Sequence, residues 1–459
     1  MLFPWLSVIF VPMFYSFSTY QSHYKHLITL GVPVIIGQLG NIILSFADTL
    51  MIGQHSTYEL AAASFVNSIF NLVIISAMGF TYGLTPLLGA VVGRNDRLQA
   101  GSLAKNSLAA NTVVAFLLVM CMGVIYSVIE LLGMPEELVP LMKSYFLVLL
   151  ASLPFVLWFN TFKQFSDGIL DTRTPMWILL FGNLFNIIGN YLLIYGKLGL
   201  PELGLNGAGI ATLVSRIAMA GIGFLLFFTR KSNREYRLGF LRGKINKVDF
   251  WDLNRMGWPV FLQMGMETAS FSLSSIMVGW IGTVAMAAHQ IMLTISQLCY
   301  LVFYGMSAAV AVRISHFRGQ HDLLNLRRTA SAGFHLNLFL ILFTSFPVFL
   351  LRNVVGGLFT DSQEVALLVA QTIVPLVVYQ FGDGLQINYS SALRGIGDVK
   401  PMVWYAFLAY FVISLPVGYF LGIVCQLGLI GIWFAFPFGL TSAGILYYIR
   451  FRKSVAFLR

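Results

Sequence analysis

The sequence has little charge and few cysteines. Only 10% of its 459 residues are charged and 58% are apolar, a balance that a water-soluble globular protein of this size could not keep dispersed. The cysteines Cys121, Cys299 and Cys425 are isolated in or near apolar stretches. They therefore indicate neither a disulfide framework nor a metal cluster, and we expect no cofactor.

What the sequence does contain is a series of long apolar runs. A transmembrane helix needs about 20 mostly apolar residues, and we predict twelve such spans. They are residues 29–53, 62–91, 106–129, 144–162, 176–196, 207–229, 258–281, 287–312, 331–351, 366–392, 402–423 and 428–449. The predicted fold class is therefore an all-α polytopic membrane protein, and the short connections leave no room for a soluble catalytic domain.

The basic residues are distributed by side of the membrane. A net charge of +10 could indicate a nucleic-acid partner, but most of the Lys and Arg fall in every second connection. The predicted outer segments keep only Lys143, Lys197 and Arg352. Cytoplasmic loops are the ones enriched in Lys and Arg, so we predict that both termini are cytoplasmic and that no nucleic acid binds.

One fixed offset relates the two halves of the chain. A GVPV segment that starts at Gly31 recurs as GWPV at Gly257, 226 residues later, and the same offset aligns Asp96 with Asp322. Matches in one register over such a distance favour a duplication. Each half would hold six helices and enter the membrane in the same direction, so the halves should be related by an axis along the membrane normal.

This repeat gives the predicted domains. They are an apolar leader at residues 1–25, an N-lobe with helices 1 to 6 at 26–229, a cytoplasmic link at 230–256, and a C-lobe with helices 7 to 12 at 257–459. Transporters of this design place the substrate path between the halves and alternate access by rocking one half against the other.

Polar side chains recur at helical spacing inside several spans. In the first span, Gln38, Asn41 and Asp48 lie on one helical face. The other candidates for lining a cavity are Asn67, Asn186, Asn190, Gln263, Ser274, Gln290 and Gln386. A single Asn or Ser in a membrane usually bonds a neighbouring helix, which is the alternative at each position, but stripes on several helices indicate a water-filled cavity.

Three carboxylates lie inside the predicted spans: Asp48, Glu267 and Asp383. An acid near mid-membrane costs at least about 2.5 to 3.5 kcal/mol on insertion scales, so we favour an ion or substrate site over structural pairing with Arg216. Carboxylate, amide and hydroxyl oxygens together suit an alkali cation or a shared proton. We expect the main site in the second half, with Na⁺ possible at Glu267 and Asp383.

Several segments carry a family resemblance. They are FADTLMIG at 46–53, GME at 265–267, AAHQ at 287–290, YQFGDGLQ at 379–386 and LRG at 393–395. In order and spacing they resemble the multidrug and toxic compound extrusion (MATE) family, most closely its NorM-like bacterial branch. The resemblance covers nearly the whole chain. It implies a fold of two pseudo-symmetric six-helix bundles, that of the MATE family and its MOP superfamily.

The resemblance also implies an activity, which is cation-coupled efflux of diverse, often cationic drugs across a bacterial inner membrane, by a functional monomer in contact with lipid. Asp48, Glu267 and Asp383 look like the acids that NorM-like members use, and Tyr379 resembles the aromatic residue beside the last of these. Asn186 and Asn190 resemble polar residues of helix 5. A sister branch has an Asp in helix 5 where this chain has Asn, and the coupling ion stays open between Na⁺ and H⁺.

Other function classes predict other residues. A lipid-linked oligosaccharide flippase of the same superfamily would line its cavity with several basic side chains for the pyrophosphate, whereas the candidates here are acidic. A membrane-embedded enzyme would need a nucleophile with its base, or a metal motif, and the sequence offers neither. A channel would not need two alternating lobes.

Overall fold

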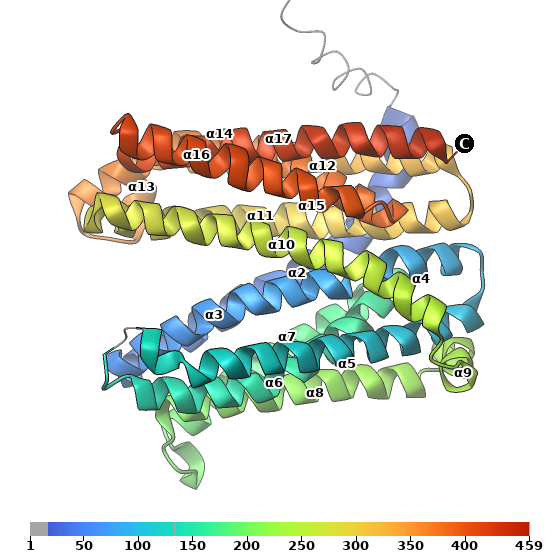
Figure 1. The fold of residues 1–459 in the computed structure, drawn as a ribbon, viewed down its shortest axis with the longest axis horizontal. Coiled ribbons are helices and arrows are strands. Elements are labelled where there is room, and N and C mark those ends of the chain that lie inside the picture. Colours follow the sequence, from blue (N-terminus) through green and yellow to red (C-terminus); the bar gives the residue numbers. More distant parts are fainter. Residues whose placement is uncertain (1–16, 133–134, 459) are drawn as a thin grey trace, which may run out of the picture. The chain divides into compact units, whose positions relative to one another are not determined.

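The computed structural model describes residues 17–132 and 135–458. Helices joined by short connections make up this described part, and no strand occurs in it (Figure 1). Most of the predicted apolar leader, residues 1–16, lies outside the described residues.

The helices follow one another with short connections. In chain order they are α2 (Phe17–His55), α3 (Thr57–Thr81), α4 (Leu84–Gly93), α5 (Arg97–Ser127), α6 (Val139–Gly168), α7 (Arg173–Ile194), α8 (Gly204–Thr229), α9 (Arg234–Arg242), α10 (Lys247–Ile281), α11 (Thr283–Gly319), α12 (Leu323–Leu350), α13 (Arg352–Val355), α14 (Gln363–Ile396), α15 (Lys400–Ala406), α16 (Leu415–Tyr419) and α17 (Gly428–Phe457). Short 3-10 turns are η2 (Ile129–Leu132), η3 (Lys197–Gly199), η4 (Lys231–Asn233) and η5 (Gly356–Leu358), and π-helical segments are η6 (Phe407–Ser414) and η7 (Phe420–Val424).

Eleven of the described helical segments are long and apolar enough to cross a membrane, and they coincide with eleven of the twelve predicted spans. The twelfth, 258–281, is helical as part of α10 but is not among these eleven. The reason is local, because that stretch contains Glu267 and several serines. The predicted helix is present, but its apolar character is weaker than that of the others.

The chain packs as two compact units. One is Ile36–Gly265, and the other is formed by the described residues up to Ile35 together with those from Met266 onward. The division therefore falls inside α2 and inside α10, whereas the lobes predicted from the sequence begin at 26 and 257 and are separated by a link. Pro33 and Pro259 lie inside these two helices just before the divisions, and a proline there removes a backbone hydrogen bond from the helix.

In the unit Ile36–Gly265, α6 packs against α3, α5 and α8, and α7 packs against α8. Its largest apolar core includes Phe70 and Phe146, whose rings meet edge to face. The predicted link contains α9, which crosses α5 closely at Gly101 and Gly239. A Cβ added to Gly101 would lie 1.9 Å from the carbonyl oxygen of Tyr236.

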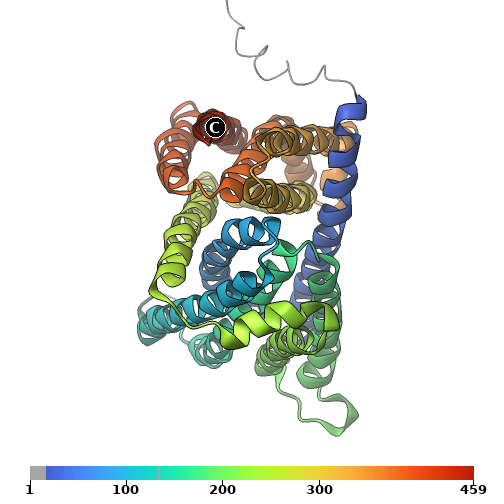
Figure 2. The same ribbon diagram turned by 90° about the vertical axis from the view of Figure 1, so that its right-hand side faces the viewer.

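In the other unit, α14 packs against α11, α12 and α17 (Figure 1). Figure 2 shows α17, whose end is marked C, nearly end-on. Its core contains Trp433 and Phe436 from α17 and Tyr379 from α14. The start of α2 is tied to α12 by hydrogen bonds, 3.1 Å long between His23 Nδ1 and Thr329 Oγ1.

The sequence repeat reappears in the turns before two helices. Asp96 caps α5 by accepting a hydrogen bond from the Gln99 N–H at 3.0 Å, and Asp322 caps α12 by accepting one from the Asn325 N–H at the same distance. The bond from the Asn325 N–H holds the pKa of Asp322 below its ordinary value, since it stabilises the charged form. Residues 226 positions apart thus form the same cap.

Candidate functional site

The first candidate site lies in the unit that contains α14, and we call it the acid cluster: Glu267, Asp383, Gln386, Tyr379 and Tyr410. α14 presents Tyr379, Asp383 and Gln386 at spacings of four and three residues, which places them on one helical face. Glu267 comes from α10 and Tyr410 from the π-helical segment η6. The predicted acids of the second half are therefore brought together by three elements.

Gln386 connects the elements of the acid cluster. Its Nε2 donates to Glu267 Oε2 at 3.3 Å and to the hydroxyl oxygen of Tyr410 at 3.0 Å. Glu267 also interacts electrostatically with Asp383. Asp383 is 2% exposed, and in the described part of the chain its Oδ2 and the Oε1 of Gln386 are buried without a hydrogen-bond partner. Buried oxygens without donors are what a bound cation or an added proton would satisfy.

Tyr379 of the acid cluster packs against other aromatic side chains. The hydroxyl of Tyr379 is 2.7 Å from Ser296 Oγ, and its ring meets Trp433 edge to face with centroids 6.1 Å apart. The indole Nε1 of Trp433 donates to Nδ1 of His289 at 3.1 Å, and Nε2 of His289 is 2.9 Å from Ser275 Oγ. Because an indole can only donate, the proton of His289 must be on Nε2. His289 therefore serves to orient Trp433.

The second candidate site lies in the unit Ile36–Gly265, and we call it the mixed-charge cluster: Asp48, Asn190, Arg216, Tyr145 and Ser152. Asp48 Oδ1 accepts a hydrogen bond from Asn190 Nδ2 at 2.5 Å. Arg216 NH1 donates to Ser152 Oγ at 2.6 Å. Arg216 also interacts electrostatically with Asp48 and with Tyr145. α2, α6, α7 and α8 each contribute to this cluster.

Other predicted polar residues surround the mixed-charge cluster or extend from it. The Tyr145 hydroxyl donates to Asn67 Oδ1 at 3.3 Å, and Asn186 Nδ2 donates to Thr212 Oγ1 at 3.2 Å. Two further hydrogen bonds in the same unit link three amide side chains. Asn183 Nδ2 donates to Asn41 Oδ1 at 3.0 Å, and Asn41 Nδ2 donates to Gln38 Oε1 at 3.2 Å. The polar faces predicted for the first and fifth spans therefore meet.

The remaining predicted cavity residues are Gln263, Ser274 and Gln290. Gln263 is buried on α10, in the part that belongs to the unit Ile36–Gly265. Ser274 is buried within α10, and Gln290 is exposed on α11. Sequence reasoning missed Tyr410, Tyr145 and Ser152, because a single tyrosine or serine in an apolar span carries no signal of its own.

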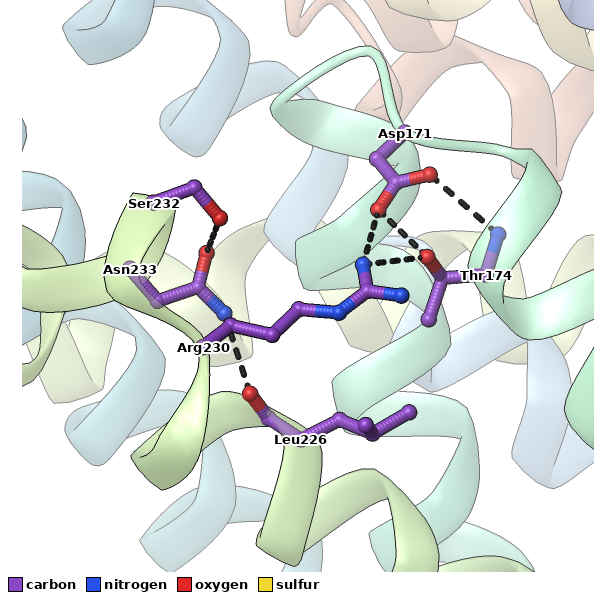
Figure 3. A network of polar contacts seen from close by, with 6 residues as sticks. All are labelled: Asp171, Thr174, Leu226, Arg230, Ser232 and Asn233. Carbon is purple, nitrogen blue, oxygen red and sulfur yellow. Dashed lines mark hydrogen bonds and ion pairs between the residues drawn. The ribbon is translucent and has the colours of Figure 1, made fainter.

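A small pocket is present elsewhere in the unit Ile36–Gly265, lined by residues of α6, α7 and α8 and of the segment after α8. Figure 3 shows Arg230 reaching towards Asp171 and Thr174: its NH1 donates to Asp171 Oδ2 at 3.0 Å and to Thr174 Oγ1 at 2.6 Å. Lys163, which also lines the pocket, is paired with Asp167 at 2.9 Å. Arg230 and Lys163 are thus each already paired with an aspartate. We therefore interpret the polar contacts of this pocket as structural, holding neighbouring helix ends together.

The family assignment follows from the chain as a whole. The family model MatE matches residues 33–192 and 259–420, which include Asp48, Asn190, Glu267, Asp383 and Tyr410. The chain belongs to the MatE family. The two matched segments lie in the two halves of the repeat, and the predicted family is confirmed. Assignment to the NorM-like branch stays a prediction.

Solved transporters share the fold of this MatE protein. A MOP superfamily transporter from Pyrococcus furiosus is 21% identical, with a TM-score of 0.85 over 95% of this chain and 96% of that chain. A mutant of the Vibrio cholerae MATE transporter VcmN is 19% identical, with a TM-score of 0.86 over 96% and 98%. A eukaryotic MATE transporter is 18% identical, with a TM-score of 0.86 over 96% and 99%. These similarities confirm the predicted all-α, MATE-type fold.

Proposed function

We propose that this MatE transporter exports cationic, amphiphilic compounds in exchange for Na⁺ or H⁺. The observation that carries the proposal is the acid cluster, in which the buried Asp383 lies within electrostatic range of Glu267. Two carboxylates near each other in a membrane domain repel when both are ionised. Binding of a cation or a proton relieves that repulsion, so the cluster favours an occupied state.

The residues present fit either ion. Na⁺ is a hard cation that oxygen ligands bind, and the oxygens of Asp383, Glu267 and Gln386, with the hydroxyls of Tyr379 and Tyr410, would hold it. H⁺ would instead reside on one carboxylate, and the other carboxylate would stabilise that shared state. In both cases the ion's charge is what changes the balance between the two access states.

A reconstituted transport assay tests this proposal. Purified protein in proteoliposomes is given an inward Na⁺ gradient or, separately, an inward proton gradient, and transport of a fluorescent monovalent organic cation is followed. We expect one of the two inward gradients to drive the organic cation out of the vesicles against its own concentration gradient. If neither gradient drives transport while the protein stays folded, cation-coupled antiport is wrong.

The proposal includes the placement of the protein in a bacterial inner membrane, with both termini cytoplasmic and a monomer as the functional unit. The basic residues of the segment between α8 and α10 support this orientation, and no cofactor is needed. In a variant without native cysteines, a cysteine in place of Lys244, which is exposed, should resist an impermeant thiol reagent in intact cells. Labelling from outside would reverse the topology.

A further inference from the structure

Arg216 is a charged residue in the middle of an apolar helix. It lies on α8, which is long and apolar enough to cross a membrane. Within the described residues, its hydrogen bonding consists of one bond, from NH1 to Ser152 Oγ. A guanidinium carries five N–H donors in a planar fork, so most of its capacity is not used by the protein. The side chain is partly exposed rather than sealed.

The acid of the same cluster does not neutralise Arg216 by contact. Asp48 interacts with it electrostatically, yet the ion pairs found among the described residues do not include these two. Asp48 instead accepts its hydrogen bond from Asn190. The cluster therefore holds a cation and an anion that are near each other but separate, and charges inside a membrane domain usually mark a pathway for a polar ligand.

Amide oxygens add acceptors beside the two charges. The Oδ1 atoms of Asn186 and Asn190 are buried and have no hydrogen-bond partner in the described part of the chain. Both residues are on α7, and Asn190 is the one that contacts Asp48. A ligand in the mixed-charge cluster would therefore meet hydrogen-bond acceptors, the amide and carboxylate oxygens, near Asp48. It would meet a planar hydrogen-bond donor, the guanidinium group, at Arg216.

From this arrangement we propose that Arg216 binds the anionic group of the substrate, a carboxylate in the first instance, while Asp48 attracts its cationic group. The inference rests on the proposed export function and narrows its range of substrates. Zwitterionic compounds should bind more tightly than compounds of the same skeleton that carry only a positive charge. A carboxylate matches the guanidinium fork with two parallel hydrogen bonds. Arg216 is in this view a specificity residue, which a coupling role for Asp48 alone would not require.

The competing explanation is structural, in which Arg216 only offsets the charge of Asp48 and fixes Ser152. That explanation predicts no difference between a substrate with a free carboxylate and the same substrate with the carboxylate esterified. Rhodamine B is a suitable probe, because it is a zwitterion at neutral pH, and its ethyl ester is a cation with the same ring system.

The experiment measures equilibrium binding of both dyes to the full-length protein purified in detergent, by fluorescence anisotropy. We expect the wild type to bind the acid about tenfold or more tightly than the ester, since hydrogen bonds to charged groups are strong. Arg216→Gln should bring the ratio of the two dissociation constants close to one. Arg230→Gln is the matched control, because it removes the same charge in the same unit outside the cluster and should leave the ratio unchanged.

A second variant covers the case in which Arg216→Gln does not fold. Arg216→Lys keeps the charge but loses the planar fork, so it should lower the preference for the acid severalfold without abolishing it. An absence of preference in the wild type, or an unchanged ratio in the folded Arg216 variants, would overturn the proposal. Because binding is measured without any gradient, loss of the preference in Arg216→Gln supports this site even if neither gradient drives transport.

Discussion

Asn95 and His321 are related by the 226-residue repeat and have the same left-handed backbone, with φ of 61° and 58°. Each precedes the aspartate that caps the next helix, Asp96 before α5 and Asp322 before α12. The turn is therefore the same in both halves, and its left-handed position is occupied by Asn in one half and by His in the other. Asn adopts the left-handed region more readily than His does.

This difference predicts unequal effects of glycine at the two positions. Both side chains are exposed, so little packing is lost. His321→Gly should raise the free energy of unfolding by about 0.5 to 1 kcal/mol, and Asn95→Gly should raise it less, because glycine removes more strain at the histidine. Thermal unfolding in detergent measures this. A stabilisation of Asn95→Gly that equals or exceeds that of His321→Gly would contradict the explanation.

The acid cluster gives a prediction about coupling. Glu267→Gln and Asp383→Asn keep shape but remove the charge that would hold Na⁺, or the proton that would be exchanged. Gradient-driven export should fall at least about tenfold in each variant, which corresponds to roughly 1.4 kcal/mol. Asn41→Ala, at the repeat position of Glu267, should reduce export less, because Asn41 carries no titratable proton.

Detergent stability must be measured beside export in these variants. If the acids were structural, the neutral variants would lose stability as well as export, since a buried partner would be left without its charge. Export at the wild-type rate by both well-folded variants would remove the acid cluster from the coupling mechanism.

Two ion pairs hold the ends of helices within the two units. Asp398 accepts hydrogen bonds from Arg450 Nε at 2.6 Å and from Arg450 NH2 at 3.2 Å, whereas Asp171 is bound by the single NH1 of Arg230. The Asp398 side chain is also less exposed, 22% against 34%. Asp398→Asn should therefore lower the unfolding temperature more than Asp171→Asn, whose cost should be about 1 kcal/mol or less. An equal drop in unfolding temperature in both variants would show that the second hydrogen bond from Arg450 to Asp398 does not contribute to stability.

The crossing of α5 and α9 depends on glycine. In Gly101→Ala the new methyl group would meet the backbone of Tyr236, so α9 would have to move away, at a cost of roughly 1 to 3 kcal/mol. Gly123→Ala is the matched control on the same helix, since a Cβ there meets nothing within 4 Å. We expect faster proteolysis between α9 and α10 only in the first variant. The same cleavage rate in both would refute the role of this crossing.

The sequence predicted the features that depend on local composition. Long apolar runs gave helices at all twelve positions, because a helix in lipid satisfies its own backbone hydrogen bonds. The repeat and the placement of Asp48, Glu267 and Asp383 inside spans were also readable, since period and spacing alone determine which residues share a helical face. The family motifs then gave the fold class that the solved transporters confirm.

Only the tertiary structure decided which of these residues meet. Gln386 contacts both Glu267 and Tyr410, and Arg216 turns to Ser152 rather than pairing with Asp48. No local pattern specifies these contacts, because they join residues on different helices whose rotation and depth are set by packing. The division of α2 and α10 between the two units has the same origin, since a helix is one element in sequence but its two halves can bury their surfaces against different neighbours.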